Sequence, residues 1–136
     1  MSLRILIADD HPTVRRTLRQ LLENNEEWLV CGDAANGQEA VQKAASLKPD
    51  VIILDASMPV MNGYEAASHI CSAAPDMPIL IYTQFAAAPN SASVGIRQII
   101  NKASPHILLS AVRALQAEID ARTTPLAARP DPQKIG

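Results

Sequence analysis

Five short apolar runs rich in β-branched residues recur along the chain, and stretches with helical character separate most of them. The runs are RILIA (4–8), WLVCG (28–32), VIIL (51–54), PILIYT (78–83) and IRQII (96–100). Continuous apolar runs of this length are typical of strands that are buried on both faces. Strands that alternate with helices form βαβ units with right-handed crossovers. The alternation therefore predicts an α/β fold, in which helices cover both faces of an open, five-stranded parallel sheet.

Four stretches carry the features of helices. Residues 12–25 repeat valine and leucine at positions i, i+4, i+7 and i+8, with arginines between them. Two further stretches end at Pro49 and Pro75, as helices commonly do. The last, residues 104–119, opens with Ser104, a residue type that caps helix N-termini. These stretches are predicted to be the helices that pack on the sheet.

The sequence changes character after Ala121. The segment RTTPLAARPDPQKIG contains three prolines and has no apolar period, which is typical of linkers. We therefore expect one domain over residues 1–121 and a flexible linker or tail over residues 122–136.

Composition narrows the class of protein. The 136 residues are 48% apolar, and 12 basic against 14 acidic side chains give a net charge of −2, so charge does not favour direct binding to nucleic acid or an anionic membrane. Cys31 and Cys71 lack metal-ligand spacing. No apolar run is long enough to cross a membrane. These features predict a reduced, cytoplasmic protein with no membrane contact.

Polar side chains follow four of the predicted strands. Asp9 and Asp10 follow the first, Asp55 follows the third, Thr83 ends the fourth, and Lys102 lies just beyond the fifth. Each alone would be an ordinary capping acid, strand end or solvated charge. In an open parallel sheet, however, the carboxyl ends of the strands share one edge, where ligands bind. We expect these five residues to form one site.

Clustered carboxylates need compensation. Two carboxylates 4 Å apart repel by about 4 kcal/mol at an effective dielectric constant of 20. A divalent cation relieves this repulsion, and an oxygen-only donor set with open positions favours Mg²⁺. Lys102 and Thr83 suit the oxygens of a phosphoryl group on Asp55. The pattern predicts phosphoryl transfer to a carboxylate.

The motifs ILIADDH, VIILDASMPVMNG and ILIYT, together with Lys102, resemble the receiver domain of two-component response regulators. The resemblance covers about the first 120 residues. It implies a flavodoxin-like doubly wound sheet with strand order 2-1-3-4-5. ADDHPTVR and AANGQEAV are similar to the NarL/LuxR-type branch, whose members usually carry a C-terminal helix-turn-helix domain that this chain does not contain.

The resemblance also assigns roles to individual residues. Asp55 would be the phosphoacceptor and a Mg²⁺ ligand. Asp10 would bind Mg²⁺ directly, Asp9 would act through water, and the backbone carbonyl of Ser57 would be a further ligand. The phosphoryl oxygens would be held by Thr83 and Lys102.

The implied function is signalling rather than enzymatic, with autocatalytic phosphotransfer only. A sensor histidine kinase would supply the phosphoryl group. The other partners implied are a second copy of the chain, as a homodimer, and DNA only through an absent output domain.

Two departures from the family pattern concern the switch. Ile99 occupies the position three residues before Lys102 where the family usually has an aromatic residue. The segment between Thr83 and Lys102 is shorter than is typical and contains Pro89. The fourth helix of the family, which lies between the fourth and fifth strands, is therefore expected to be short or irregular here. The chemistry is therefore predicted to be intact and the conformational switch atypical.

Alternatives remain open. A pseudo-receiver, an interaction domain whose site drives no switch, fits Ile99. A phosphohydrolase with Asp55 as nucleophile would commonly need a second carboxylate at the position of Ser57. His11 could ligate a metal, although its place beside Pro12 favours a simple helix entry.

Overall fold

The computed structural model describes residues 2–84 and 95–123, which contain one five-stranded parallel sheet in the order β2-β1-β3-β4-β5. This order confirms the predicted flavodoxin-like architecture. Strands β1, β3 and β4 are buried almost throughout, because helices cover both faces of the sheet. The strands are β1 (Leu3–Ala8), β2 (Trp28–Ala34), β3 (Val51–Leu54), β4 (Ile79–Thr83) and β5 (Ile96–Asn101).

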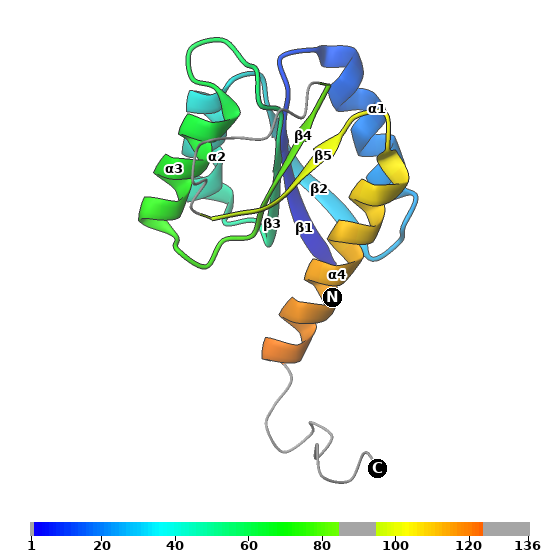
Figure 1. Cartoon of the computed structure of the whole chain (residues 1–136). Coiled ribbons are helices and arrows are strands. Elements are labelled where there is room, and N and C mark those ends of the chain that lie inside the picture. Colours follow the sequence, from blue (N-terminus) through cyan, green and yellow to red (C-terminus); the bar gives the residue numbers. More distant parts are fainter. Residues whose placement is uncertain (1, 85–94, 124–136) are drawn as a thin grey trace, which may run out of the picture.

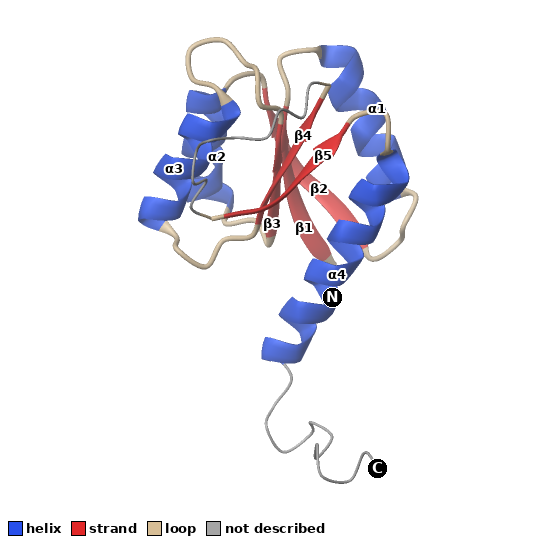
Figure 2. Ribbon diagram, viewed as in Figure 1, coloured by secondary structure: helices blue, strands red, loops and turns tan. Residues whose placement is uncertain are grey.

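Two pairs of helices enclose the sheet. Figures 1 and 2 show α1 and α4 on one face and α2 and α3 on the other. The helices are α1 (Pro12–Glu23), α2 (Gly37–Leu47), α3 (Gly63–Ala73) and α4 (Pro105–Thr123).

Each face has its own core. The face under α1 and α4 is packed by large side chains, among them Trp28 and Tyr82. The face under α2 and α3 includes several alanines, such as Ala40 and Ala66, opposite aliphatic strand residues. Small side chains let α2 and α3 lie close to the sheet and to each other.

Two asparagines fix the starts of α2 and α3. The Asn36 side chain accepts a hydrogen bond from the amide of Glu39 at 2.8 Å, and Asn62 accepts one from Glu65 at 2.9 Å. Each satisfies an amide that has no partner within its helix. The Gly37 amide also donates to the Met61 carbonyl at 2.9 Å, so the start of α2 is attached to the loop after β3.

Three expectations concern the end of the domain, the helix expected between β4 and β5, and the linker. Helix α4 ends at Thr123, two residues beyond the predicted domain end at Ala121, because no proline interrupts it before Pro125. The expected short or irregular helix falls largely within residues 85–94, and most of the predicted linker lies at 124–136; both segments are outside the described residues. In the described part of the chain, no helix has both the length and the apolar character needed to cross a membrane.

Candidate functional site

The predicted site residues meet at the carboxyl edge of the sheet, and backbone hydrogen bonds fix them there. The amide of Asp55 donates to the Ala8 carbonyl at 2.9 Å, and the amide of Lys102 donates to the Thr83 carbonyl at 2.9 Å. The strand pairing thus continues one residue past the ends of β3 and β5. Asp9, Asp55 and Thr83 are all buried. The site is therefore held by the main chain of the sheet.

Asp9 is the better compensated of the two buried carboxylates. Its Oδ2 accepts a hydrogen bond from Lys102 Nζ at 2.5 Å, and its Oδ1 accepts one from the His11 amide at 2.9 Å. Burial by itself would raise the pKa of Asp9, but these hydrogen bonds and the charge of Lys102 outweigh burial and lower it. Asp9 is consequently held in its ionised form.

Asp55 has the opposite balance. Lys102 Nζ lies 3.3 Å from Asp55 Oδ2, farther than from Asp9. Burial, followed by the negative charge of Asp9, raises the pKa of Asp55, while Lys102 and a hydrogen bond from the Thr83 side chain only partly offset these effects. The ionised form of Asp55 is therefore stabilised when a further positive charge approaches.

Lys102 joins the two carboxylates. Burial alone would lower its pKa, but the hydrogen bonds and charges of Asp9 and Asp55 raise it, so the ammonium group stays charged. The Tyr82 hydroxyl donates to the Lys102 carbonyl at 3.1 Å, and this contact helps to position the lysine backbone.

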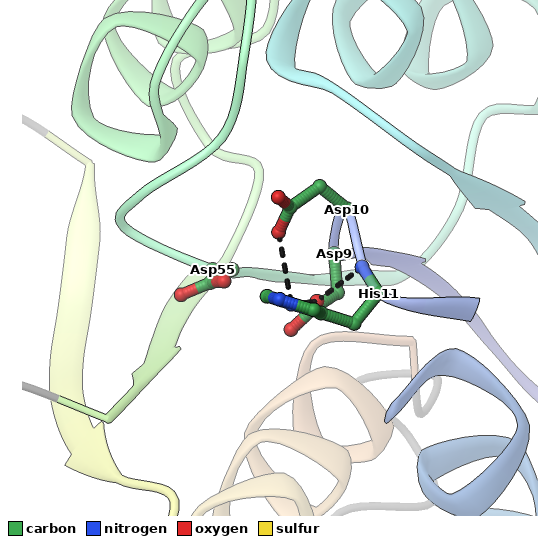
Figure 3. A group of neighbouring side chains, drawn as sticks. All are labelled: Asp9, Asp10, His11 and Asp55. Atoms are coloured by element: carbon green, nitrogen blue, oxygen red, sulfur yellow. Dashed lines mark hydrogen bonds and ion pairs between the residues drawn. The ribbon is translucent and has the colours of Figure 1, made fainter. Parts of the chain in front are cut away.

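Asp10 places a buried carboxylate oxygen beside this pair. Its side chain is 31% exposed, yet in the described part of the chain its Oδ1 is buried and makes no hydrogen bond, with His11 Nδ1 at an ion-pair distance of 3.1 Å. Oxygens or nitrogens from Asp9, Asp10, His11 and Asp55 all lie within 4.8 Å of one another (Figure 3). A buried carboxylate oxygen that makes no hydrogen bond, beside two further carboxylates, fits a hard divalent cation.

The loop after β3 brings Asp55 and α3 together. The Gly63 amide donates to the Ala56 carbonyl at 2.9 Å, and a Cβ atom at Gly63 would lie 2.1 Å from the Asp55 carbonyl oxygen. Only glycine fits this approach. Val60 in the same loop has a φ of 68° and is 75% exposed, an unfavourable conformation for a β-branched residue.

Two further predicted residues lie near this edge. Ser57 is exposed in the loop, two residues after Asp55. Ile99 pairs with Ile81 of β4 and is partly buried against the core under α2 and α3, on the sheet face opposite Tyr82. The position expected from the resemblance to act as the switch is thus filled by an aliphatic side chain packed on the α2/α3 side.

Sequence reasoning missed two residues that support the site. Tyr82 directly precedes Thr83, so the sequence alone could have drawn attention to a hydroxyl group next to a predicted site residue. Arg15 donates from Nη1 to the Asp9 carbonyl at 2.7 Å and lies 3.9 Å from Asp33. No spacing rule identifies this second contact.

Comparisons with known proteins agree with the geometry. Residues 5–113 match the response regulator receiver domain. The chain is 45% identical over 83 residues to a protein-glutamate methylesterase/protein-glutamine glutaminase of Idiomarina loihiensis, covering 61% of this chain and 21% of that protein. It is 43% identical over 83 residues to the transcriptional regulatory protein LnrK of Bacillus subtilis, covering 61% of this chain and 38% of that protein.

A solved structure gives the same result. The response regulator protein TrrA from Thermotoga maritima, in complex with Mg²⁺-BeF, is 31% identical with a TM-score of 0.77, over 85% of this chain and 99% of that chain. The NarL/LuxR-type branch is not confirmed, because the relatives include methylesterases as well as transcriptional regulators. The chain belongs to the response regulator receiver domains of two-component systems.

Proposed function

We propose that this receiver domain accepts a phosphoryl group on Asp55 from a phosphohistidine of a sensor kinase. A carboxylate oxygen of Asp55 forms the new bond to phosphorus while the bond from phosphorus to the kinase imidazole breaks, and the imidazole leaves with the electron pair. The observation that carries the proposal is the position of Lys102 Nζ, 3.3 Å from Asp55 and 2.5 Å from Asp9.

The residues around Asp55 divide the work. Lys102 supplies positive charge to a phosphoryl oxygen, and Thr83 supplies a hydroxyl donor. Asp10, Asp55 and the Ser57 carbonyl would hold Mg²⁺, with Asp9 acting through water because both of its oxygens already have partners. When bound, Mg²⁺ neutralises charge on the transferring group. The solved relative in complex with Mg²⁺-BeF supports this assignment.

The output of the signal is a further part of the proposal. The aligned segment is only 38% of the length of the transcriptional regulator LnrK, so the rest of such a protein has room for an output domain. We propose that this receiver controls a helix-turn-helix DNA-binding domain in the cytoplasm, and that DNA and a homodimer partner are contacted in that context. The activity that names the methylesterase relative does not transfer, since the match covers 21% of that protein.

A second candidate follows from Ile99. Its partly buried, aliphatic side chain has no ring or hydroxyl to exchange positions when Thr83 moves. Phosphorylation would then shift the arrangement of β4 and β5 less than in a typical receiver, because a population shift is limited by the difference in affinity between the two states. This is the pseudo-receiver alternative.

The test is phosphorylation with acetyl phosphate and Mg²⁺, followed by intact mass spectrometry. We expect one phosphoryl adduct on the unmodified chain, none on Asp55→Asn, and the normal adduct on Asp76→Asn, an exposed aspartate on the loop before β4. An adduct that survives in Asp55→Asn would refute the acceptor assignment. If the adduct forms normally, but NMR spectra of the phosphorylated chain show no chemical-shift changes beyond the site, the result would favour the pseudo-receiver.

A further inference from the structure

His11 extends its side chain into the acidic cluster. Figure 3 shows the imidazole ring reaching from the end of β1 toward Asp55, beside the Asp10 carboxylate. Nδ1 lies 3.1 Å from Asp9 Oδ1 and 3.1 Å from Asp10 Oδ1. The ring nitrogen therefore faces two of the carboxylates proposed to bind the cation.

The fold gives little other reason for an imidazole here. His11 is the N-cap residue of α1, but its side chain makes no capping hydrogen bond, and its backbone is in an ordinary extended conformation with φ −98°. The side chain is 67% exposed, so its packing contributes little to stability. The backbone amide, which any residue other than proline has, makes one hydrogen bond to Asp9 Oδ1, so the contacts that require a histidine are those of the ring Nδ1 with Asp9 and Asp10.

The ring changes the donor chemistry of the cluster. Carboxylate, carbonyl and water oxygens suit Mg²⁺, whereas imidazole suits zinc and other later first-row divalent ions. Donors bound to one zinc ion at about 2.0–2.2 Å lie roughly 3 to 4 Å apart. The two 3.1 Å separations around Nδ1 fall within that range, so a cation bound by Asp10 can also be reached by the ring with little movement.

We infer that His11 is an additional metal ligand, which raises the affinity of the acidic cluster for Zn²⁺ and leaves its affinity for Mg²⁺ nearly unchanged. The inference rests on the proposed function in one respect, namely that Asp10 and its neighbours form the cation site. It assigns to His11 a role in selecting the ion, and none in the transfer of the phosphoryl group.

The experiment compares Zn²⁺ and Mg²⁺ affinities by calorimetric titration of the whole chain, with no phosphoryl donor present. His11→Asn and His11→Ala are each expected to weaken Zn²⁺ binding by at least about tenfold, since even the loss of a ligand's outer partner costs about 10- to 100-fold. Mg²⁺ affinity should change less than about twofold, because Mg²⁺ prefers oxygen donors. Imidazole nitrogen shifts in NMR spectra should identify His11 as the ring that binds Zn²⁺.

Matched controls separate this site from surface binding. His69→Asn and His106→Asn alter exposed histidines on α3 and α4 and should leave Zn²⁺ affinity unchanged. Unchanged Zn²⁺ affinity in both His11 variants, with weaker binding of both ions in Asp10→Asn, would overturn the role of His11 alone. If Asp10→Asn changes neither affinity, the cation site of the proposed function fails as well.

Discussion

Asp9 and Asp55 end neighbouring strands of one sheet and are both almost fully buried, at 2% and 5% exposure, yet their pKa values shift in opposite directions. Asp9 receives the shorter contact from Lys102 and a backbone amide. Asp55 receives the longer contact and the repulsion of Asp9. Burial alone therefore does not decide how an acid behaves, because the distribution of nearby donors does. The donors around Asp9 stabilise its ionised form, whereas the ionised form of Asp55 is not fully compensated by the positive charge near it.

The largest expected effect comes from removing the Lys102 ammonium group, which contacts both carboxylates. Lys102→Met should lower the free energy of unfolding by about 3 kcal/mol at neutral pH, because it leaves two buried carboxylates without their partner. Urea unfolding measures the change. Arg97→Met is the control, since the ion pair of Arg97 with Glu118 is exposed and worth at most about 1 kcal/mol. Equal effects of the two substitutions would show that Lys102 does not hold the carboxylates together.

The comparison is sharpened by neutralising each acid in turn. Asp55→Asn should raise the free energy of unfolding, because it removes a carboxylate whose ionised form is disfavoured by burial and by the charge of Asp9. Asp9→Asn should lower it by about 1.5 to 3 kcal/mol, because it weakens a hydrogen bond between two charged groups, Asp9 and Lys102. Changes of the same sign in both variants would contradict the division of roles.

The same pair predicts opposite pH dependences. The pKa of Asp55 is raised above its ordinary value of 3.8. Its contribution to the free energy of unfolding is therefore fully present below pH 3.8 and is lost as the pH rises through the raised pKa. The stability advantage of Asp55→Asn should therefore grow from about pH 3.8 upward. Since the pKa of Asp9 is lowered from 3.8, its contribution is present above that pH and is lost as pH falls. Unfolding measured across acidic pH tests both trends.

The smallest effect concerns the loops that follow these strands. Val60 has a φ of 68°, and the Met61 amide donates across it to the Pro59 carbonyl at 2.7 Å, whereas His11 after β1 is unstrained. Val60→Asn should raise the free energy of unfolding by about 1 kcal/mol, since asparagine tolerates this region. Val60→Thr keeps the branched Cβ and should give no gain. Equal thermal midpoints for the two variants would count against strain at Val60.

Much of the fold could be predicted because its causes are local in sequence. VIIL and ILIY are continuous apolar runs, and parallel strands buried on both faces require such runs. The site followed from the fold, since Asp9, Asp55 and Lys102 come directly after strands whose carboxyl ends share an edge.

Other features depend on side-chain geometry that no pattern encodes. Lys102 could have paired equally with either acid, and only the packed structure distinguishes 2.5 Å from 3.3 Å. The hydrogen bond from Tyr82 to the Lys102 carbonyl joins residues 20 positions apart. Val60 carries no sequence signal of a left-handed conformation, because glycine or asparagine would be expected there.

Two crowded glycines, which begin α2 and α3 and contact the backbone of the segment after β3, bear on mutational scanning. A Cβ atom at Gly37 would lie 2.2 Å from the Met61 carbonyl oxygen, and one at Gly63 would lie 2.1 Å from that of Asp55. At Gly32, by contrast, the nearest obstacle is the tip of the Leu47 side chain, which can rotate away. A scan that scores every substitution would therefore rank Gly37 and Gly63 among the least tolerant positions, although neither supplies a reacting atom. Intolerance at these positions would reflect the close backbone contacts that position the loop after β3, and not a role in chemistry.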